Sequence, residues 1–195
     1  MRNILIVYYS LHGATQTLAE HIAQGVLDGG CLFTLRTVPK VGPLYCASEP
    51  DVPSKGAQYV QPQDLQQCDG VILGSPSRFG QMAAPMKYFI DGLSQEWLQG
   101  TLVGKPAAFF TTSSSLHGGQ EMTLLSMMIP LLHQGALIVG LPYHGHPELS
   151  STSAGGTPYG ASHWAHTPET PFTEEEIILA RALGKRVAQI TTKLR

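Results

Sequence analysis

The segment from Val71 to Asp91 constrains the fold more than any other part of the chain, because an apolar run leads there into a polar turn and then a helical pattern. Val71–Leu73 is wholly apolar, which is typical of a strand covered on both faces in a parallel sheet. The turn combines a proline and glycines with one aromatic ring, Phe79. Such a turn suits a flat heteroaromatic ligand, because glycine permits close backbone approach and proline is rigid. An ordinary turn with a buried Phe79 is the alternative.

Strand and helix patterns alternate along the whole chain. Short apolar or β-branched runs predict strands at 4–9, 31–38, 69–73, 105–111 and 136–140. Apolar residues at helical spacing predict helices at 15–27, 84–93, 120–132 and, after a capping box of Thr173 and Glu176, to the end of the chain. We therefore expect an α/β fold, a doubly wound five-stranded parallel sheet with helices on both faces. The order 2-1-3-4-5 would place three polar loops around one crevice, and a Rossmann order is the alternative.

Size, charge and cysteine content narrow the class of protein. The 195 residues are expected to form one domain, 1–195, and the formal charge of -2 without a basic block argues against nucleic-acid binding. Only 13% of residues are charged, which predicts that an oligomer hides part of the surface. Cys31, Cys46 and Cys68 have no disulfide or zinc spacing. No apolar run is long enough to span a membrane, so a cytoplasmic protein is expected.

Two segments interrupt this regular pattern. Pro130 lies in the helix expected at 120–132 and is predicted to distort or end it. The stretch 141–171 is expected to be irregular, and a loop of that length is usually functional or lies at an interface. It holds four histidines whose spacing matches no metal-ligand pattern, so no metal site is predicted: His144, His146, His163 and His166.

Three loops follow strands that would share one sheet edge. The first precedes a helix N-terminus and is expected to bind one phosphate, with plain helix capping as the alternative. The third is rich in hydroxyl groups, and without a Gly-x-Ser-x-Gly elbow a serine nucleophile is the weaker interpretation. The candidate binding residues of the three loops are Ser10, Leu11, His12, Gly13, Ala14 and Thr15; Pro76, Ser77, Arg78, Phe79 and Gly80; and Thr112, Ser113, Ser114, Ser115, Leu116, His117 and Gly118.

Several strings in these loops and beyond them resemble one family in order along the chain. They include Gly-Ser-Pro-Ser-Arg-Phe-Gly-Gln-Met-Ala-Ala-Pro-Met-Lys from Gly74, His-Gly-Gly-Gln-Glu from His117 and Gly-Thr-Pro-Tyr-Gly-Ala-Ser from Gly156. Nearly the whole chain resembles the WrbA family of flavodoxin-like NAD(P)H:quinone oxidoreductases. The resemblance implies a flavodoxin-like fold, FMN as cofactor, NADH or NADPH and quinones as partners, and a homotetramer with sites built between subunits.

The same resemblance assigns roles to individual residues. The first loop would bind the FMN phosphate, and the second and third would hold the two sides of the isoalloxazine. His133 matches a family histidine near the flavin and is the candidate proton donor, with packing as the alternative. Trp97 matches a tryptophan in the nicotinamide and quinone pocket, with simple burial as the alternative. His12 stands where the family commonly has tyrosine, and we expect it to contact cofactor and substrate.

The resulting expectation is an FMN-dependent enzyme that reduces quinones by two electrons in a ping-pong cycle. Flavin carries the hydride chemistry, so the protein has to hold the ring and leave one face open. Arg78 would either stabilise reduced flavin or form a surface salt bridge. A flavin-binding electron carrier, or a regulatory partner protein without quinone turnover, is the alternative.

Overall fold

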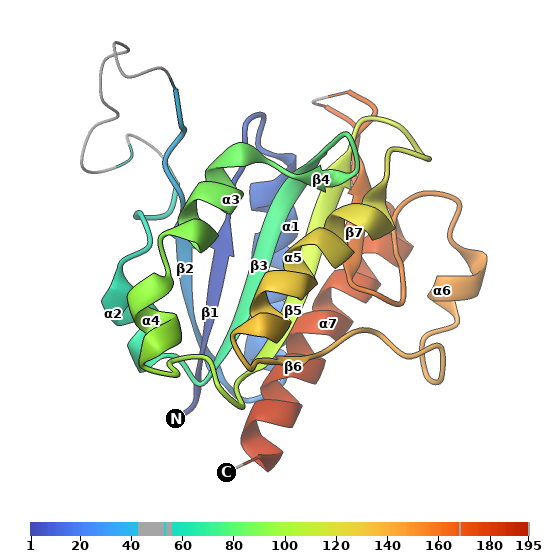
Figure 1. The fold of residues 1–195 in the computed structure, drawn as a ribbon. Coiled ribbons are helices and arrows are strands. Elements are labelled where there is room, and N and C mark those ends of the chain that lie inside the picture. The colour runs from blue at the N-terminus through green and yellow to red at the C-terminus, as the bar shows by residue number, and fades with distance from the viewer. Residues whose placement is uncertain (43–52, 54–55, 168, 195) are drawn as a thin grey trace.

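The computed structural model describes residues 1–42, 53, 56–167 and 169–194 (Figure 1). A parallel sheet forms its centre, and the strands run in the order β2-β1-β3-β5-β6. Their bounds are β1 Asn3–Tyr8, β2 Leu32–Thr37, β3 Gly70–Arg78, β5 Pro106–Ser113 and β6 Leu137–Ile138. In the order in which the sequence predicts them, this is 2-1-3-4-5, so the expected topology is confirmed and the Rossmann order is wrong. Cys46 lies outside the described residues.

The fifth position of the sheet is filled by two strands instead of one. β6 pairs with the start of β5, at Pro106 and Ala107, whereas β7, Ala161–Trp164, pairs with its end. The expectation of one strand at 136–140 followed by irregular chain to 171 is therefore wrong. The chain leaves the sheet after Ile138, passes through the short helix α6, Glu148–Ser151, and returns to the same edge (Figure 1). β7 escaped prediction because Ala-Ser-His-Trp has no run of β-branched residues.

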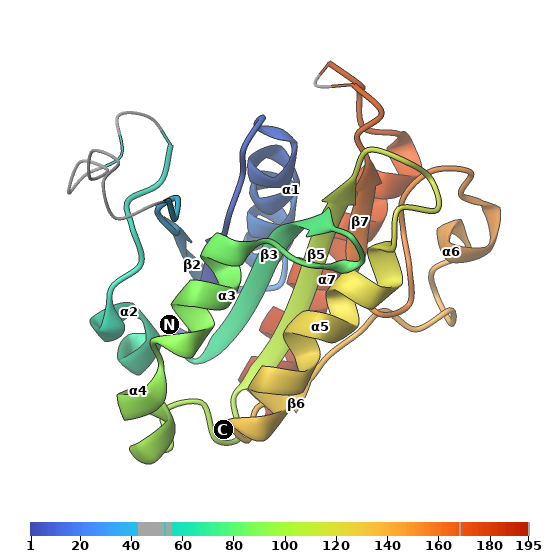
Figure 2. The same cartoon turned by 45° about the horizontal axis from the view of Figure 1, so that its top comes forward.

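Helices cover both faces of the sheet. α1, Ala14–Asp28, and α7, Glu174–Lys193, pack against one face, and α3, Ala84–Asp91, and α5, Gln120–His133, lie on the other (Figure 2). Alternate residues of the buried strands enter two separate cores, as in β1, where Ile4 and Ile6 face α1 and Leu5 and Val7 face α3. The two other helices of the residues that the structure describes are short: α2, Pro62–Gln67, and α4, Ser94–Leu98.

Two local expectations have different outcomes. The capping box of α7 is confirmed: the Thr173 hydroxyl accepts the Glu176 N–H, and the Glu176 carboxylate accepts the Thr173 N–H. Pro130 does not end α5, which continues to His133. Met127 and Leu131, on either side of the proline, are fully buried, and their packing holds the helix through the missing N–H.

β3 is longer than the apolar run that predicts it. It continues to Arg78, where the chain reverses and β4, Gln81–Met82, pairs with it antiparallel. The turn between them therefore lies beyond the end of the parallel ladder, at the upper edge of the sheet in Figure 1. Among the described residues, no helix has both the length and the apolar character needed to cross a membrane.

Candidate functional site

The carboxyl edge of the sheet carries a cavity of about 260 Å³ that all three predicted loops line. A second space, of about 620 Å³, continues it between the second and third loops. Every candidate from these loops lines one of the two spaces except Gly13 and Leu116. Neither lining contains a carboxylate, whereas Arg78 and the imidazoles of His12 and His117 are present. This edge of the sheet therefore has hydrogen-bond donors and positive charge that favour the binding of an anion.

The first loop ends in the N-terminus of α1, which no side chain caps. Gly13, the residue before the helix, has φ 97° and donates its N–H to the Ser10 hydroxyl at 3.1 Å. The Thr15 and Thr112 hydroxyls lie 3.0 Å apart and connect the first loop to the third. Free amides at a helix N-terminus favour an anion, so this geometry supports phosphate binding over plain capping.

Phe79 forms the tip of the second loop and is fully exposed. It has φ 53° and is alone in this left-handed conformation among the non-glycine residues that the structure describes. The alternative of a turn with a buried phenylalanine is therefore wrong. A strained backbone that presents an apolar ring to solvent is typical of a binding site, because packing within the chain does not explain it. Arg78 donates to the Ser77 carbonyl at 2.9 Å, and no carboxylate of the described residues pairs with it.

Hydrogen bonds hold the third loop against the second. The Ser77 hydroxyl donates to the Gly118 carbonyl at 2.7 Å and accepts from Thr123 at 2.9 Å. Gly119 has φ 76°, and a Cβ there would lie 2.7 Å from the Gly80 Cα, so only glycine allows the two loops to come this close. Ser113 donates to the Ser115 carbonyl and accepts from Gln120, so its hydroxyl is not poised as a nucleophile.

A fourth segment, which the sequence did not predict, also lines the cavity. Ala165, His166 and Thr167 follow β7 and complete the lining beside the first and third loops. No clear signal in the sequence predicts this segment, because β7, which precedes it, lacks a clear strand pattern. Of the other histidines in that stretch, His163 is buried and its Nδ1 lies 2.8 Å from Glu176 Oε2. Among the described residues, no group of three potential metal ligands comes together.

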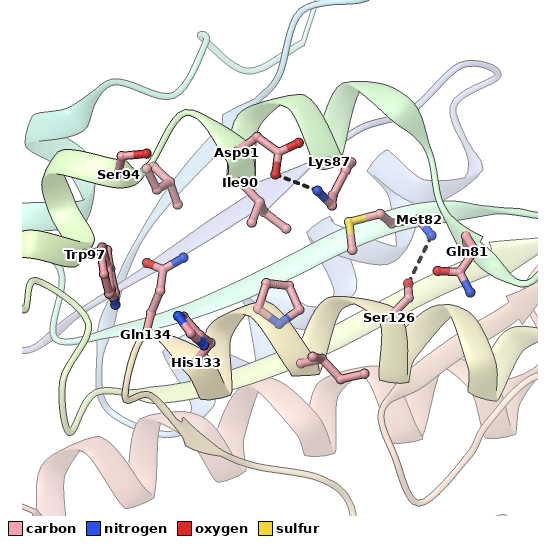
Figure 3. Close-up of a pocket in the computed structure, with 13 residues that line it drawn as sticks. Gln81, Met82, Lys87, Ile90, Asp91, Ser94, Trp97, Ser126, His133 and Gln134 are labelled. Carbon is pink, nitrogen blue, oxygen red and sulfur yellow. Dashed lines mark hydrogen bonds and ion pairs between the residues drawn. The ribbon is translucent and has the colours of Figure 1, made fainter.

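Trp97 and His133 lie elsewhere, in a groove of about 620 Å³ between α3, α4 and α5 (Figure 3). Their rings stack with centroids 5.8 Å apart and an interplanar angle of 29°. Trp97 is 48% exposed, so simple burial within this chain does not account for it. The other walls combine apolar side chains, such as Ile90 and Ile129, with polar ones that include the Lys87–Asp91 ion pair. The groove shares no lining residue with the crevice, and one chain does not bring these two rings to the three loops.

The cavity fits a flavin mononucleotide in three respects. An uncapped helix N-terminus suits the phosphate group. Hydroxyl groups line the cavity beside that helix end. The second and third loops, which are held close together, line a space next to the exposed ring of Phe79. The order of the strands and the position of the crevice define a flavodoxin-like protein with a ligand site at the carboxyl ends of the strands. Solved structures agree on the fold. A WrbA-like flavodoxin from Agrobacterium tumefaciens matches with a TM-score of 0.70 and 21% identity, covering 100% of both chains.

A second structure, the oxidised flavodoxin 2 from Bacillus cereus, has a TM-score of 0.63 at 18% identity and covers 96% of this chain and 99% of its own. Residues 2–144 match the NADPH-dependent FMN reductase family, and the chain belongs to that family. Relatives named NAD(P)H dehydrogenase (quinone) are similar over their full length. The protein from Geobacter sulfurreducens is 42% identical with 98% of both chains covered, and that from Gluconacetobacter diazotrophicus is 40% identical with 100% and 99% covered.

Proposed function

We propose that the protein is an FMN-dependent NAD(P)H:quinone oxidoreductase that reduces quinones by two electrons. The observation that carries this proposal is the convergence of three loops and an uncapped helix N-terminus on one crevice free of carboxylates. Full-length relatives named for the same reaction support it. The alternative of an electron carrier is weaker, since carriers of that class dock through acidic residues around the flavin and the crevice lining has none.

In this proposal each loop has a separate task. The amides at the start of α1, with the hydroxyls of Ser10 and Thr15, hold the phosphate. The turn at Pro76–Gly80 and the loop Ser113–Gly118 hold the ring from two sides. Arg78, which no described carboxylate neutralises, stabilises negative charge on the bound flavin. Bound FMN supplies the hydride chemistry, and no acid or base of the chain has to break a bond.

The substrate side of the site requires more than one copy of the chain. The resemblance places Trp97 in the substrate pocket and His133 near the flavin, but both line a groove separate from the crevice of their own chain. The fully exposed Phe79 and the half-exposed Trp97 are apolar surfaces that a partner subunit would cover. We therefore propose a homotetramer, formed by the single domain 1–195, in which this groove of one subunit faces the crevice of another. The proposal also places the protein in the cytoplasm.

The open face of the site would admit nicotinamide and quinone in turn. His12 lies at the crevice, where its imidazole is available to contact either partner. Because both substrates use one pocket, the kinetics are ping-pong: double-reciprocal plots at several quinone concentrations run parallel, and each substrate inhibits at high concentration by competing with the other.

Binding, turnover and mass measurements on the purified full chain test the proposal. Titration with FMN should give a saturable flavin spectrum, NADH or NADPH should bleach it without oxygen, and benzoquinone should restore it. Light scattering should give the mass of a tetramer. A yellow protein that turns over neither nucleotide with benzoquinone would favour the electron carrier. Intersecting plots without substrate competition would overturn the ping-pong scheme but leave the cofactor assignment intact.

A further inference from the structure

The segment after β7 is built into the crevice by specific bonds. The Ala165 N–H donates to the Ser113 carbonyl at 2.8 Å, which extends the pairing of β5 and β7 into the third loop. The Trp164 N–H donates to the buried Glu176 carboxylate at 3.0 Å. The Thr167 N–H donates to the Thr170 hydroxyl at 2.7 Å. The segment is therefore a fixed wall of the cavity.

His166 is the ionisable group of this wall. It lines the same cavity as the uncapped start of α1, with His12 and Arg78 as the other groups that carry or accept positive charge there. Its ring lies 5.6 Å from that of Trp164, centroid to centroid, at an interplanar angle of 52°. Four chain segments thus direct donors at one small volume, and none of them brings a carboxylate.

We infer that His166 is a specificity-determining residue that recognises the terminal phosphate monoester of the bound flavin. This inference rests on the proposed function, because it assigns the phosphate of FMN to this cavity. An imidazolium donates a charge-assisted hydrogen bond, which is stronger than a neutral one and is lost when the ligand has no phosphate. His166 therefore favours FMN over riboflavin, which has the same ring and ribityl chain but ends in a hydroxyl.

Flavin binding, independent of turnover, tests the inference. Dissociation constants for FMN and for riboflavin are measured by fluorescence quenching on wild type, His166→Gln and His166→Lys. We expect His166→Gln to weaken FMN about tenfold, the effect of one charge-assisted bond. Riboflavin should change less than about twofold in the same variant. His166→Lys should recover most of the FMN affinity, because it restores the positive charge.

His144→Gln is the matched control, since His144 is an exposed histidine from the same long segment that lines neither space of the crevice. Equal weakening of FMN and riboflavin by His166→Gln, or no change in either, would overturn the inference and leave the proposed function standing. Failure of wild type to bind FMN would overturn both. Because the His166 side chain is exposed, its variants should unfold at the wild-type temperature, which circular dichroism checks.

Discussion

The crevice at the carboxyl ends of the strands and the groove that Trp97 and His133 line differ in the chemical groups that they offer to a ligand. The crevice is lined by hydroxyls, backbone donors, histidines and one arginine at the ends of parallel strands. The groove lies between α3, α4 and α5 and combines apolar side chains with the Lys87–Asp91 ion pair, and Trp97 stacks on His133 there (Figure 3). One chain therefore contains a complete candidate cofactor site and a separate, incomplete substrate wall. Under the proposed function, cofactor binding is therefore a property of the subunit and substrate recognition a property of the assembly.

The largest effect is expected from Gly119→Ala, which acts on the crevice alone. The new Cβ would lie 2.7 Å from the Gly80 Cα at φ 76°, so the second and third loops must separate. Strain and lost contacts together should cost about 2–3 kcal/mol of FMN binding, or roughly a hundredfold in Kd. Gly104→Ala is the control, because φ is 72° there but a Cβ meets nothing within 4 Å. If both variants bind FMN like wild type, the close approach of the loops is unimportant.

The next effect concerns the support of the crevice by Glu176. Its buried carboxylate accepts from the N–H groups of Gly155, Trp164 and Thr173 and pairs with His163. Glu176→Gln places an amide NH2 group in a pocket where three backbone N–H groups already donate, and we expect a loss of about 2–3 kcal/mol in the free energy of unfolding. Urea denaturation measures this. Glu174→Gln, at an exposed position in the same turn, should change it by less than about 0.5 kcal/mol.

The same group predicts how stability depends on pH. Burial acts to raise the pKa of Glu176, but the hydrogen bonds from His163, Thr173 and Trp164 outweigh it and lower the pKa below the ordinary value. A lowered pKa in the folded state means that the stabilisation is fully present above the ordinary glutamate pKa of about 4.3 and is lost as the pH falls through the folded value. The gap in stability between wild type and Glu176→Gln should therefore narrow in acid. A gap that stays constant down to the acid transition would contradict this.

A smaller, more selective effect is expected from Trp97→Ala in the groove. If the groove of one subunit faces the crevice of another, loss of the indole should lower kcat/KM for benzoquinone about tenfold, while the Kd of FMN stays within about twofold. Leu98→Ala is the control, since Leu98 is 68% exposed and does not line the groove. A parallel loss of FMN affinity would erase the distinction between the two regions.

The contrast between the regions also explains what the sequence could predict. The three loops were found because each follows a clear apolar strand, such as Val71–Leu73, and topology then places all strand ends at one edge. The wall at Ala165–Thr167 was missed because its strand has a weak pattern and is held by long-range bonds, such as that from the Trp164 N–H to Glu176. The strand propensity of a short segment carries no information about such long-range hydrogen bonds.

Trp97 and His133 show a different limit. Family resemblance supplied their roles, and no local pattern indicated that they form a groove apart from the loops. Their stacking depends on how α4 and the end of α5 pack across the sheet face, which is tertiary information. The alternative that Pro130 ends α5 would even have removed His133 from the helix that positions it. A residue can thus be assigned to a reaction before its place in the molecule is known.

His133→Gln gives the smallest expected effect and separates two roles for this residue. Because His133 stacks on Trp97, loss of its ring should weaken only the positioning of the indole, an aromatic pair worth about 0.5–1.5 kcal/mol, and lower benzoquinone turnover about threefold. A proton donor to the quinone would instead cost about a hundredfold or more and change the pH profile. A double-mutant cycle with Trp97→Ala separates the two roles. If His133 only positions the indole, His133→Gln causes no further loss of benzoquinone turnover in the Trp97→Ala background, because no indole remains to be positioned. Additive losses would show that His133 acts on the quinone independently of Trp97.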